Sequence, residues 1–115
     1  DCTQAMDQTA LGVIHYLTRS THELCESSEE MYRASGSEAV RSAACKALVQ
    51  NLRLVRLLWP ADAPREALNE ALSVAGDPDR CMHACLTDML DDVRQEVDSY
   101  FQGLGLDPGS ISLEP

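Results

Sequence analysis

Apolar residues recur every three or four positions along most of the chain, and this spacing constrains the fold more than any other feature. Residues at this spacing share one face of an α-helix, so the pattern predicts amphipathic helices that each bury one side. Glycine and proline interrupt the pattern at Gly36, Pro60 and Gly76. The interruptions divide the chain into helices that we predict at about 3–33, 38–58, 64–75 and 78–102. No stretch alternates with a period of two for long enough to form a strand, and we expect an all-α fold.

Capping signals locate the starts of the later helices. Ser35 and Glu38 have the spacing of a capping box before the second helix. Asp62 followed by Pro64 is typical of an N-cap with proline in the first turn, where the missing N–H is not needed. The same signal recurs at 77–78, directly before the last predicted helix.

The predicted helix lengths favour one architecture. The first, second and fourth predicted helices have roughly 20 residues or more, whereas the third is short. These lengths fit an antiparallel helical bundle of three long helices plus one short crossover helix at one end. A chain of 115 residues supports a single domain. We assign the bundle to residues 1–102. Residues 103–115 contain glycine and proline without a period, so we expect them to form a flexible tail.

Five cysteines indicate a disulfide framework and an oxidising compartment. None of them has the Cys-x-x-Cys spacing of zinc ribbons or thioredoxin-like sites. The sequence begins at Asp1 without an apolar leader, as a secreted protein does after removal of its signal peptide. We therefore expect an extracellular protein, secreted or part of an ectodomain, whose bundle is braced by disulfides.

Helical geometry predicts which cysteines can pair. Cys25 and Cys45 lie eleven and nine residues from the glycine of the first turn, so antiparallel helices place them at one level, and we predict a Cys25–Cys45 bridge. Cys2 lies at the opposite end of the first helix, roughly 35 Å away. If the last helix starts at that end, either Cys81 or Cys85 bonds Cys2. The other is then an odd thiol that is available to another molecule.

Motifs for metal binding and catalysis are incomplete. On a continuous helix, His83 points about 200° away from Cys81, so that Cys81, His83 and Cys85 cannot converge on one ion. The sequence from His22 begins like the zinc-protease motif His-Glu-x-x-His, but Glu26 stands where the second histidine is needed. We therefore predict no catalytic residue, no metal site and no cofactor, and the chain is not expected to be an enzyme.

The charge balance excludes several classes of partner. Nine Lys and Arg against nineteen Asp and Glu give a formal net charge of −10. Nucleic acid and anionic membranes both require a basic footprint, so neither is expected to bind. No apolar run reaches the roughly 20 residues that cross a bilayer, and we predict no transmembrane segment. The expected partner is another protein, either a receptor or a ligand.

Charges are segregated between two of the predicted helices. The helix at 38–58 carries a basic row with no carboxylate between Glu38 and Asp62, and the last helix carries an acidic row. Such rows either lie side by side and pair internally, or the basic row steers an acidic partner. The candidate partner-binding residues are Arg41, Lys46, Arg53, Arg56, Asp88, Asp92 and Glu96.

These observations predict a non-catalytic protein-binding module that acts through its helical surface. The chain can also pair with a second copy of itself, either through a disulfide formed by the odd cysteine or as a non-covalent dimer. The alternative function is a carrier of a small hydrophobic ligand, such as a lipid, sterol or odorant, inside the bundle. Thirteen alanines make the core rich in small residues, whereas a ligand cavity calls for more large apolar lining.

Overall fold

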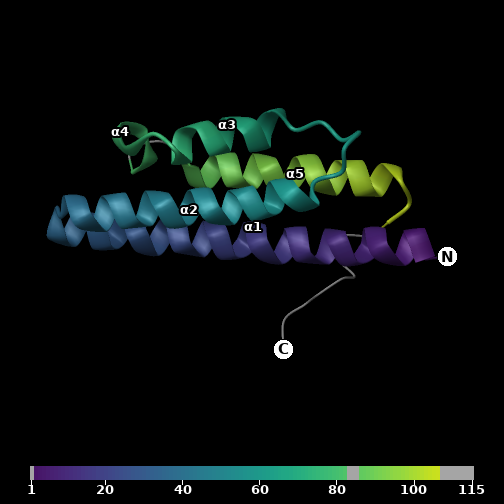
Figure 1. Cartoon of the computed structure of the whole chain (residues 1–115), viewed down its shortest axis with the longest axis horizontal. Helices are drawn as coiled ribbons and strands as arrows, with labels where there is room; N and C mark the ends of the chain where they lie inside the picture. The colour runs from purple at the N-terminus through teal and green to yellow at the C-terminus, as the bar shows by residue number, and fades with distance from the viewer. Residues whose placement is uncertain (1, 83–85, 107–115) are drawn as a thin grey trace.

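The computed structural model describes residues 2–82 and 86–106, with side chains from residue 8 onward. This part of the chain is helical and contains no strand, which confirms the predicted all-α class. The helices are α1 (Cys2–Ser35), α2 (Glu38–Leu58), α3 (Glu66–Ala75), α4 (Pro78–Cys81) and α5 (Leu86–Gly103) (Figure 1). No helix in the described ranges is both long enough and apolar enough to cross a membrane.

The helices form a bundle-like arrangement. α1 packs along α2 and α5, and α3 packs along the other sides of the same two helices, while α2 and α5 do not form a packed pair (Figure 1). The turn between α1 and α2 reverses the chain at Gly36, whose φ of +63° lies in the left-handed region that glycine adopts most readily. The predicted short crossover helix therefore takes another place: α3 lies alongside α2 and α5 instead of crossing one end.

The core takes branched apolar side chains from each of the four longer helices. Their positions repeat with the spacing that predicts the helices, and burial of these side chains supplies the main stabilising free energy. The side chains with essentially no exposed surface include Leu11, Ile14, Leu48, Leu52, Leu68, Leu90, Val93 and Val97.

Helix starts agree with the capping signals in one place and differ in another. The side chain of Asp77 accepts a hydrogen bond from the Asp79 N–H at 3.0 Å and caps α4, as predicted. At α2, the cap is Ser37 and not Ser35, because the Ser37 hydroxyl accepts the bond from the Val40 N–H at 3.4 Å. The Ser35 hydroxyl instead donates to a carbonyl in the last turn of α1.

The predicted last helix is divided in two. α4 ends at Cys81, and α5 begins at Leu86, with residues 83–85 outside the described part of the chain. A continuous helix through this segment is therefore wrong, and the orientation that we assigned to His83 loses its basis. α5 begins at the same end of the molecule as the turn between α1 and α2, since the Thr87 hydroxyl lies 3.9 Å from the Cys25 sulfur.

The packed chain continues past the predicted boundary at 102. Gly105 has a φ of +81°, and its N–H donates to the Gln102 carbonyl at 3.0 Å. The Leu106 N–H donates to the Phe101 carbonyl at 2.9 Å, and both of these side chains are buried. This pair of bonds is the Schellman motif, which ends α5 and returns Leu106 to the core. The predicted tail beyond it, 107–115, lies outside the described residues.

Candidate functional site

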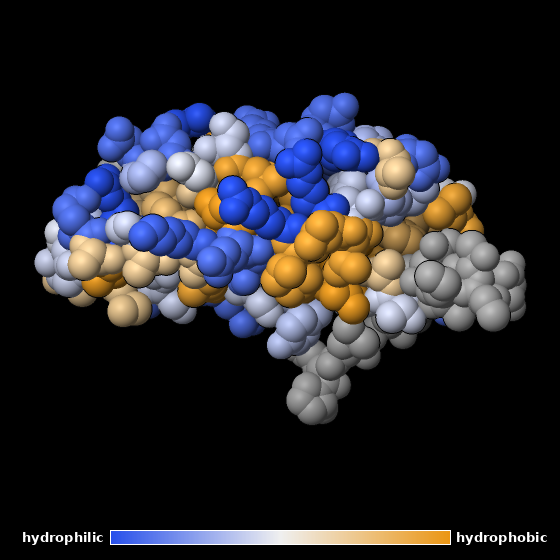
Figure 2. Space-filling view, in the orientation of Figure 1, coloured by the Kyte–Doolittle hydropathy of each residue, from blue (hydrophilic) through white to orange (hydrophobic). Residues whose placement is uncertain are grey.

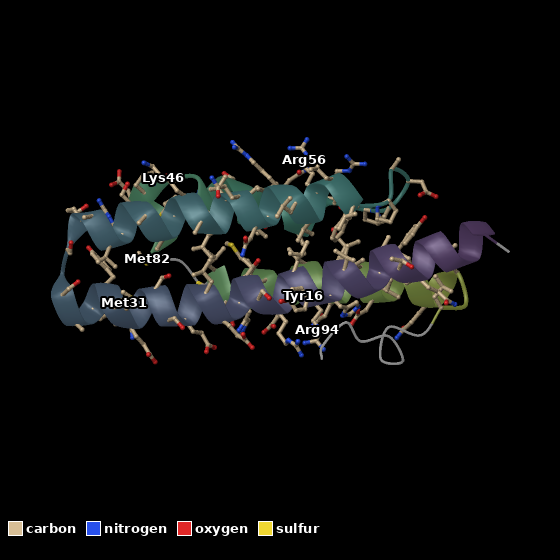
Figure 3. All side chains as sticks on the ribbon, turned by 60° about the horizontal axis from the view of Figure 1, so that its bottom comes forward. Tyr16, Met31, Lys46, Arg56, Met82 and Arg94 are labelled. Atoms are coloured by element: carbon tan, nitrogen blue, oxygen red, sulfur yellow. The ribbon has the colours of Figure 1, made fainter. Side chains whose placement is uncertain are left out.

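The outer face of α2 carries a strip of basic and apolar side chains that defines the candidate site. We call Lys46, Gln50, Arg53, Leu54, Arg56 and Leu57 the α2 strip. Helical periodicity places Lys46, Gln50, Arg53 and Leu57 opposite the buried face of α2, which contains Leu48, Leu52 and Val55. It places Leu54 and Arg56 on the two flanks. Lys46 and Arg56 both point away from α1 (Figure 3). Arginine and leucine side chains thus project from one face of α2, over about three turns of helix.

Two leucines of the α2 strip are exposed although they are apolar. The exposed fraction is 80% for Leu57 and 48% for Leu54. Exposed apolar side chains gather next to strongly hydrophilic ones on the face of the molecule seen in Figure 2. The predicted binding residues did not include these leucines. Their position in the helical repeat could have identified them as exposed, because neither lies on the face shared by Leu48 and Leu52.

The basic side chains of the strip make no ion pair with any described residue, in contrast to Arg41. Lys46, Arg53 and Arg56 are exposed. The Arg41 side chain is mostly buried, forms an ion pair with Glu38, and places its guanidinium 6.0 Å from the centre of the Tyr32 ring. Three of the four predicted basic residues are therefore open to a partner, whereas Arg41 stabilises the contact between α1 and α2.

A surface groove of about 400 Å³ runs beside the α2 strip. It lies between α2 and the segment that joins α3 to α4, and its lining includes Lys46, Val49, Arg53 and Ala75. Two cationic side chains at the groove and an apolar floor can hold a segment that carries both acidic and apolar groups. The groove extends the α2 strip toward Pro78 at the start of α4.

The acidic row on α5 does not pair with the basic row on α2. α5 packs along α1 and α3. Asp88 and Asp92 are exposed, and no described residue forms an ion pair with either. The internal pairing of the two rows, which was one of the two uses considered, is therefore wrong. The rows lie on different sides of the fold, because the short α3 occupies the place beside α2.

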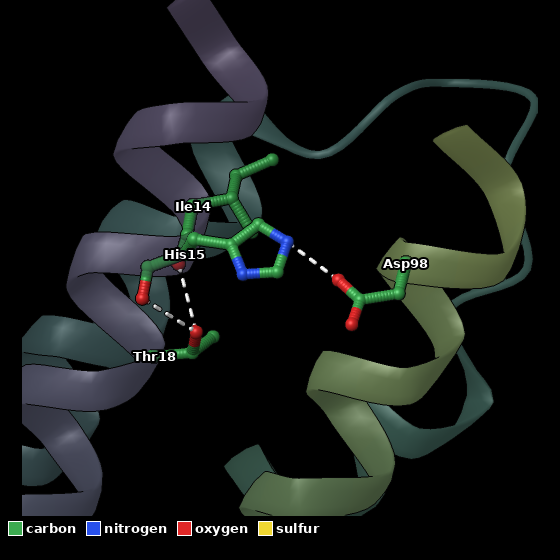
Figure 4. A network of polar contacts seen from close by, with 4 residues as sticks. All are labelled: Ile14, His15, Thr18 and Asp98. Carbon is green, nitrogen blue, oxygen red and sulfur yellow. Dashed lines mark hydrogen bonds and ion pairs between the residues drawn. The ribbon is translucent and has the colours of Figure 1, made fainter. Parts of the chain in front are cut away.

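Histidines of α1 face two other carboxylates of α5. The His15 Nε2 lies 2.5 Å from the Asp98 Oδ1 (Figure 4), and the His22 Nε2 lies 4.0 Å from the Asp91 Oδ1. Burial lowers the pKa of His15 below its ordinary value, since the cost of desolvating the imidazolium exceeds the attraction of Asp98. These contacts orient α5 on α1.

The comparisons with known proteins give no family. No family model matches the chain, and no significant match to it was found among curated proteins or solved structures.

Three cysteines from three helices lie together in the core. Cys25 of α1, Cys45 of α2 and Cys81 of α4 are buried, and each carries a free thiol in the structure. Cys45 and Cys25 lie near enough to Cys81 to help burial raise its pKa, so Cys81 lies far along α1 from Cys2. This position contradicts pairing of Cys2 with Cys81. The Cys2 side chain and Cys85 lie outside the described residues.

Among the described residues, no group of three or more His, Cys, Asp or Glu side chains has the geometry of a metal site. Burial raises the pKa of Cys25 and of Cys81, which keeps both as neutral thiols at neutral pH.

Glu96 caps a neighbouring helix instead of facing a partner. α3 starts at Glu66, later than predicted, and its N-cap Arg65 provides no side-chain hydrogen bond. The Glu96 Oε2 accepts a hydrogen bond from the Ala67 N–H in the first turn of α3, at 3.4 Å. Burial nevertheless raises the pKa of Glu96, and the hydrogen bond to Ala67 only partly offsets this effect. The carboxylate thus completes the start of α3 at a cost in desolvation.

We expect Glu96→Gln to stabilise the protein at pH 7. A carboxyl group whose pKa is higher in the folded state favours folding below its unfolded pKa, and this contribution is lost as the pH rises through the folded pKa. Glutamine keeps the acceptor for Ala67 and removes the buried charge. Urea unfolding from pH 4 to pH 8 should show the advantage of the glutamine variant shrinking as the pH falls.

The control for this prediction is Glu96→Ala, which removes both the charge and the acceptor. It should be less stable than the glutamine variant by about 1 kcal/mol, the usual value of a helix N-cap. Equal stability of the two variants would contradict the capping role of Glu96.

Proposed function

We propose that this chain is an extracellular, non-catalytic protein-binding module that recognises an acidic surface of another protein through the α2 strip. The observation that carries the proposal is the exposure of Leu57, one turn after Arg53 and next to Arg56 in the sequence, on a molecule with a net charge of −10. Exposed arginines around an apolar side chain are typical of protein interfaces, where arginine is enriched and the centre is apolar. Disulfide bracing of the helices and an extracellular location are part of this proposal.

The charge distribution supports an acidic partner. The basic side chains of the strip stand on a molecule with a net charge of −10, so the approach of an acidic partner is more favourable over α2 than over its acidic surfaces. A receptor or ligand fits this description. A second copy of the chain fits it as well, because Asp88 and Asp92 of α5 are exposed. A binding test that includes the chain itself among the candidate partners distinguishes a second copy from a different protein.

A triple variant tests the proposal. We expect R53E, R56E and L57S together to weaken binding to a partner by tenfold or more, roughly the effect of losing one interface hot spot with its steering charges. The measurement is biolayer interferometry of the wild-type protein and the variant against a panel of purified extracellular proteins. Binding of the wild-type protein should also weaken as salt is raised.

The matched control changes the same number of charges elsewhere on the surface. Arg33 and Arg80 are exposed and lie on α1 and α4, outside the α2 strip. The variant R33E with R80E should therefore bind as the wild-type protein does. Equal loss in both variants would assign binding to net charge alone, and a panel without any partner would contradict the proposed function.

The alternative function, a carrier of a hydrophobic ligand, has less support. Hollows of about 400 and 580 Å³ lie at the surface, and their lining includes the charged side chains of Lys46, Arg53 and Glu96. An apolar ligand in either hollow would meet these charges and leave them partly desolvated. Binding of a fluorescent lipid to the protein at micromolar concentration, with displacement by an unlabelled lipid, would overturn this preference.

A further inference from the structure

The cluster of Cys25, Cys45 and Cys81 brings together thiols that are far apart in the sequence. Cys45 and Cys81 have exposed fractions of 5% and 1%, and Cys45 lies close enough to Cys81 to help burial raise the pKa of the Cys81 thiol. α4 packs against both α2 and α3, which holds Cys81 against the inner side of α2. Two buried cysteines on packed helices need little backbone movement to become bonded.

We propose that Cys45 and Cys81 form a disulfide that ties α4 to α2 when the protein meets a small-molecule disulfide such as oxidised glutathione. The inference rests on the disulfide bracing that the proposed function includes and names one bond of it, and it concerns the covalent state of the chain and not its partner. The Cys25–Cys45 bridge predicted from the sequence is the competing connection. Cys25 is less suited to it, because its sulfur lies 3.9 Å from the Thr87 hydroxyl of α5.

The reaction is an ordinary thiol–disulfide exchange. The thiolate of one cysteine attacks the small disulfide, forms a mixed disulfide and releases one small thiol. The second cysteine attacks the mixed disulfide, forms the Cys45–Cys81 bond and releases the other small thiol. The two cysteines are oxidised, the small disulfide is reduced, and the two protons from the cysteines are carried by the released thiols.

Burial determines how fast this reaction proceeds. Thiols with a raised pKa are poor nucleophiles, and a reagent must reach them before the first step. α4 has four residues and is the shortest helix in the described part of the chain, so its local opening is the expected route. Bond formation should therefore accelerate when low concentrations of urea populate the open state. After closure, the same burial protects the bond from reduction.

Peptide mapping of the oxidised protein tests the connection directly. Reduced protein is incubated with oxidised glutathione, denatured with N-ethylmaleimide present to block free thiols, and digested with trypsin. Trypsin releases Cys45 in the segment 42–46 and Cys81 in the segment 81–94, which also contains Cys85. Cyanogen bromide then cleaves after Met82 and separates these last two cysteines.

The expected result is the segment 42–46 linked to the segment 81–82. A link from 42–46 to the segment that contains Cys25 would overturn the proposal and restore the bridge predicted from the sequence. A link from 42–46 to any other segment would overturn it as well. So would complete blocking of Cys45 and Cys81 by N-ethylmaleimide after oxidation.

Two serine variants provide a matched comparison. Cys81→Ser should leave Cys45 blocked by N-ethylmaleimide, whereas Cys25→Ser should keep the linked segments. If a variant fails to fold, the map of the wild-type protein still decides the connection. The map involves no partner protein, so its failure would leave the binding test of the α2 strip unaffected.

Discussion

Trp59→Ala is expected to lower the free energy of unfolding by about 3–5 kcal/mol, the range for loss of a large buried aromatic side chain. Trp59 is the C-cap of α2 and is 7% exposed. Its indole N–H donates to the Pro64 carbonyl at 2.9 Å and so fixes the connection that leads to α3. The substitution removes the side chain that fills this corner and leaves the carbonyl without its donor. Urea unfolding followed by far-ultraviolet circular dichroism measures the loss.

Trp59→Phe separates the two contributions. Phenylalanine keeps most of the buried ring and removes only the donor to Pro64, so the expected loss is about 1–2 kcal/mol. A loss below 1 kcal/mol for the alanine variant would contradict the packing role, because a side chain that merely lies on the surface costs little to remove. Correct placement of α3, and with it the groove beside the α2 strip, depends on this corner.

Oxidation of the Cys45–Cys81 pair is expected to raise the free energy of unfolding by about 4 kcal/mol. The bond would close a loop of about 36 residues and restrict the unfolded chain by that loop-closure entropy. The loop contains α3 and half of α2, including the exposed leucines of the α2 strip. Urea unfolding of the oxidised protein, before and after reduction by dithiothreitol, measures the difference.

Cys81→Ser is the control for this measurement. The variant cannot form the bond, so the same reduction should leave its unfolding midpoint unchanged. A wild-type midpoint that does not move on reduction, in a sample whose map shows the linked segments, would contradict the expected stabilisation. Strain in the bonded state would then have cancelled the gain from loop closure.

The sequence predicts the helices well where local signals control them. The second helix was predicted at 38–58 and is found as Glu38–Leu58, and the cap at Asp77 is confirmed. The start of α3 was missed because its capping acceptor, Glu96, comes from a residue 29 positions away. No local pattern carries that information, since it arises only when α5 packs along α3.

The binding residues were predicted in part for a similar reason. Net charge and spacing identify the basic residues of α2, but they do not show which of them α1 covers, as it covers Arg41. The place of Cys81 depends on how the chain turns between α3 and α5. The expectation of a short helix that crosses one end of the bundle placed the start of the last helix, and Cys81 with it, at the wrong end. Leu57 was recognisable by its phase in the repeat, although only the structure shows that nothing described covers it.

The separation of α2 from α5 gives the molecule an electric dipole moment across its short dimensions. The positive end is the α2 strip, and the negative end includes Asp88 and Asp92. The field of an acidic partner would rotate such a molecule during diffusion, so that α2 leads on arrival. Added salt screens this rotation and slows association, while the lifetime of the complex, which depends on contacts such as those of Leu57, changes much less.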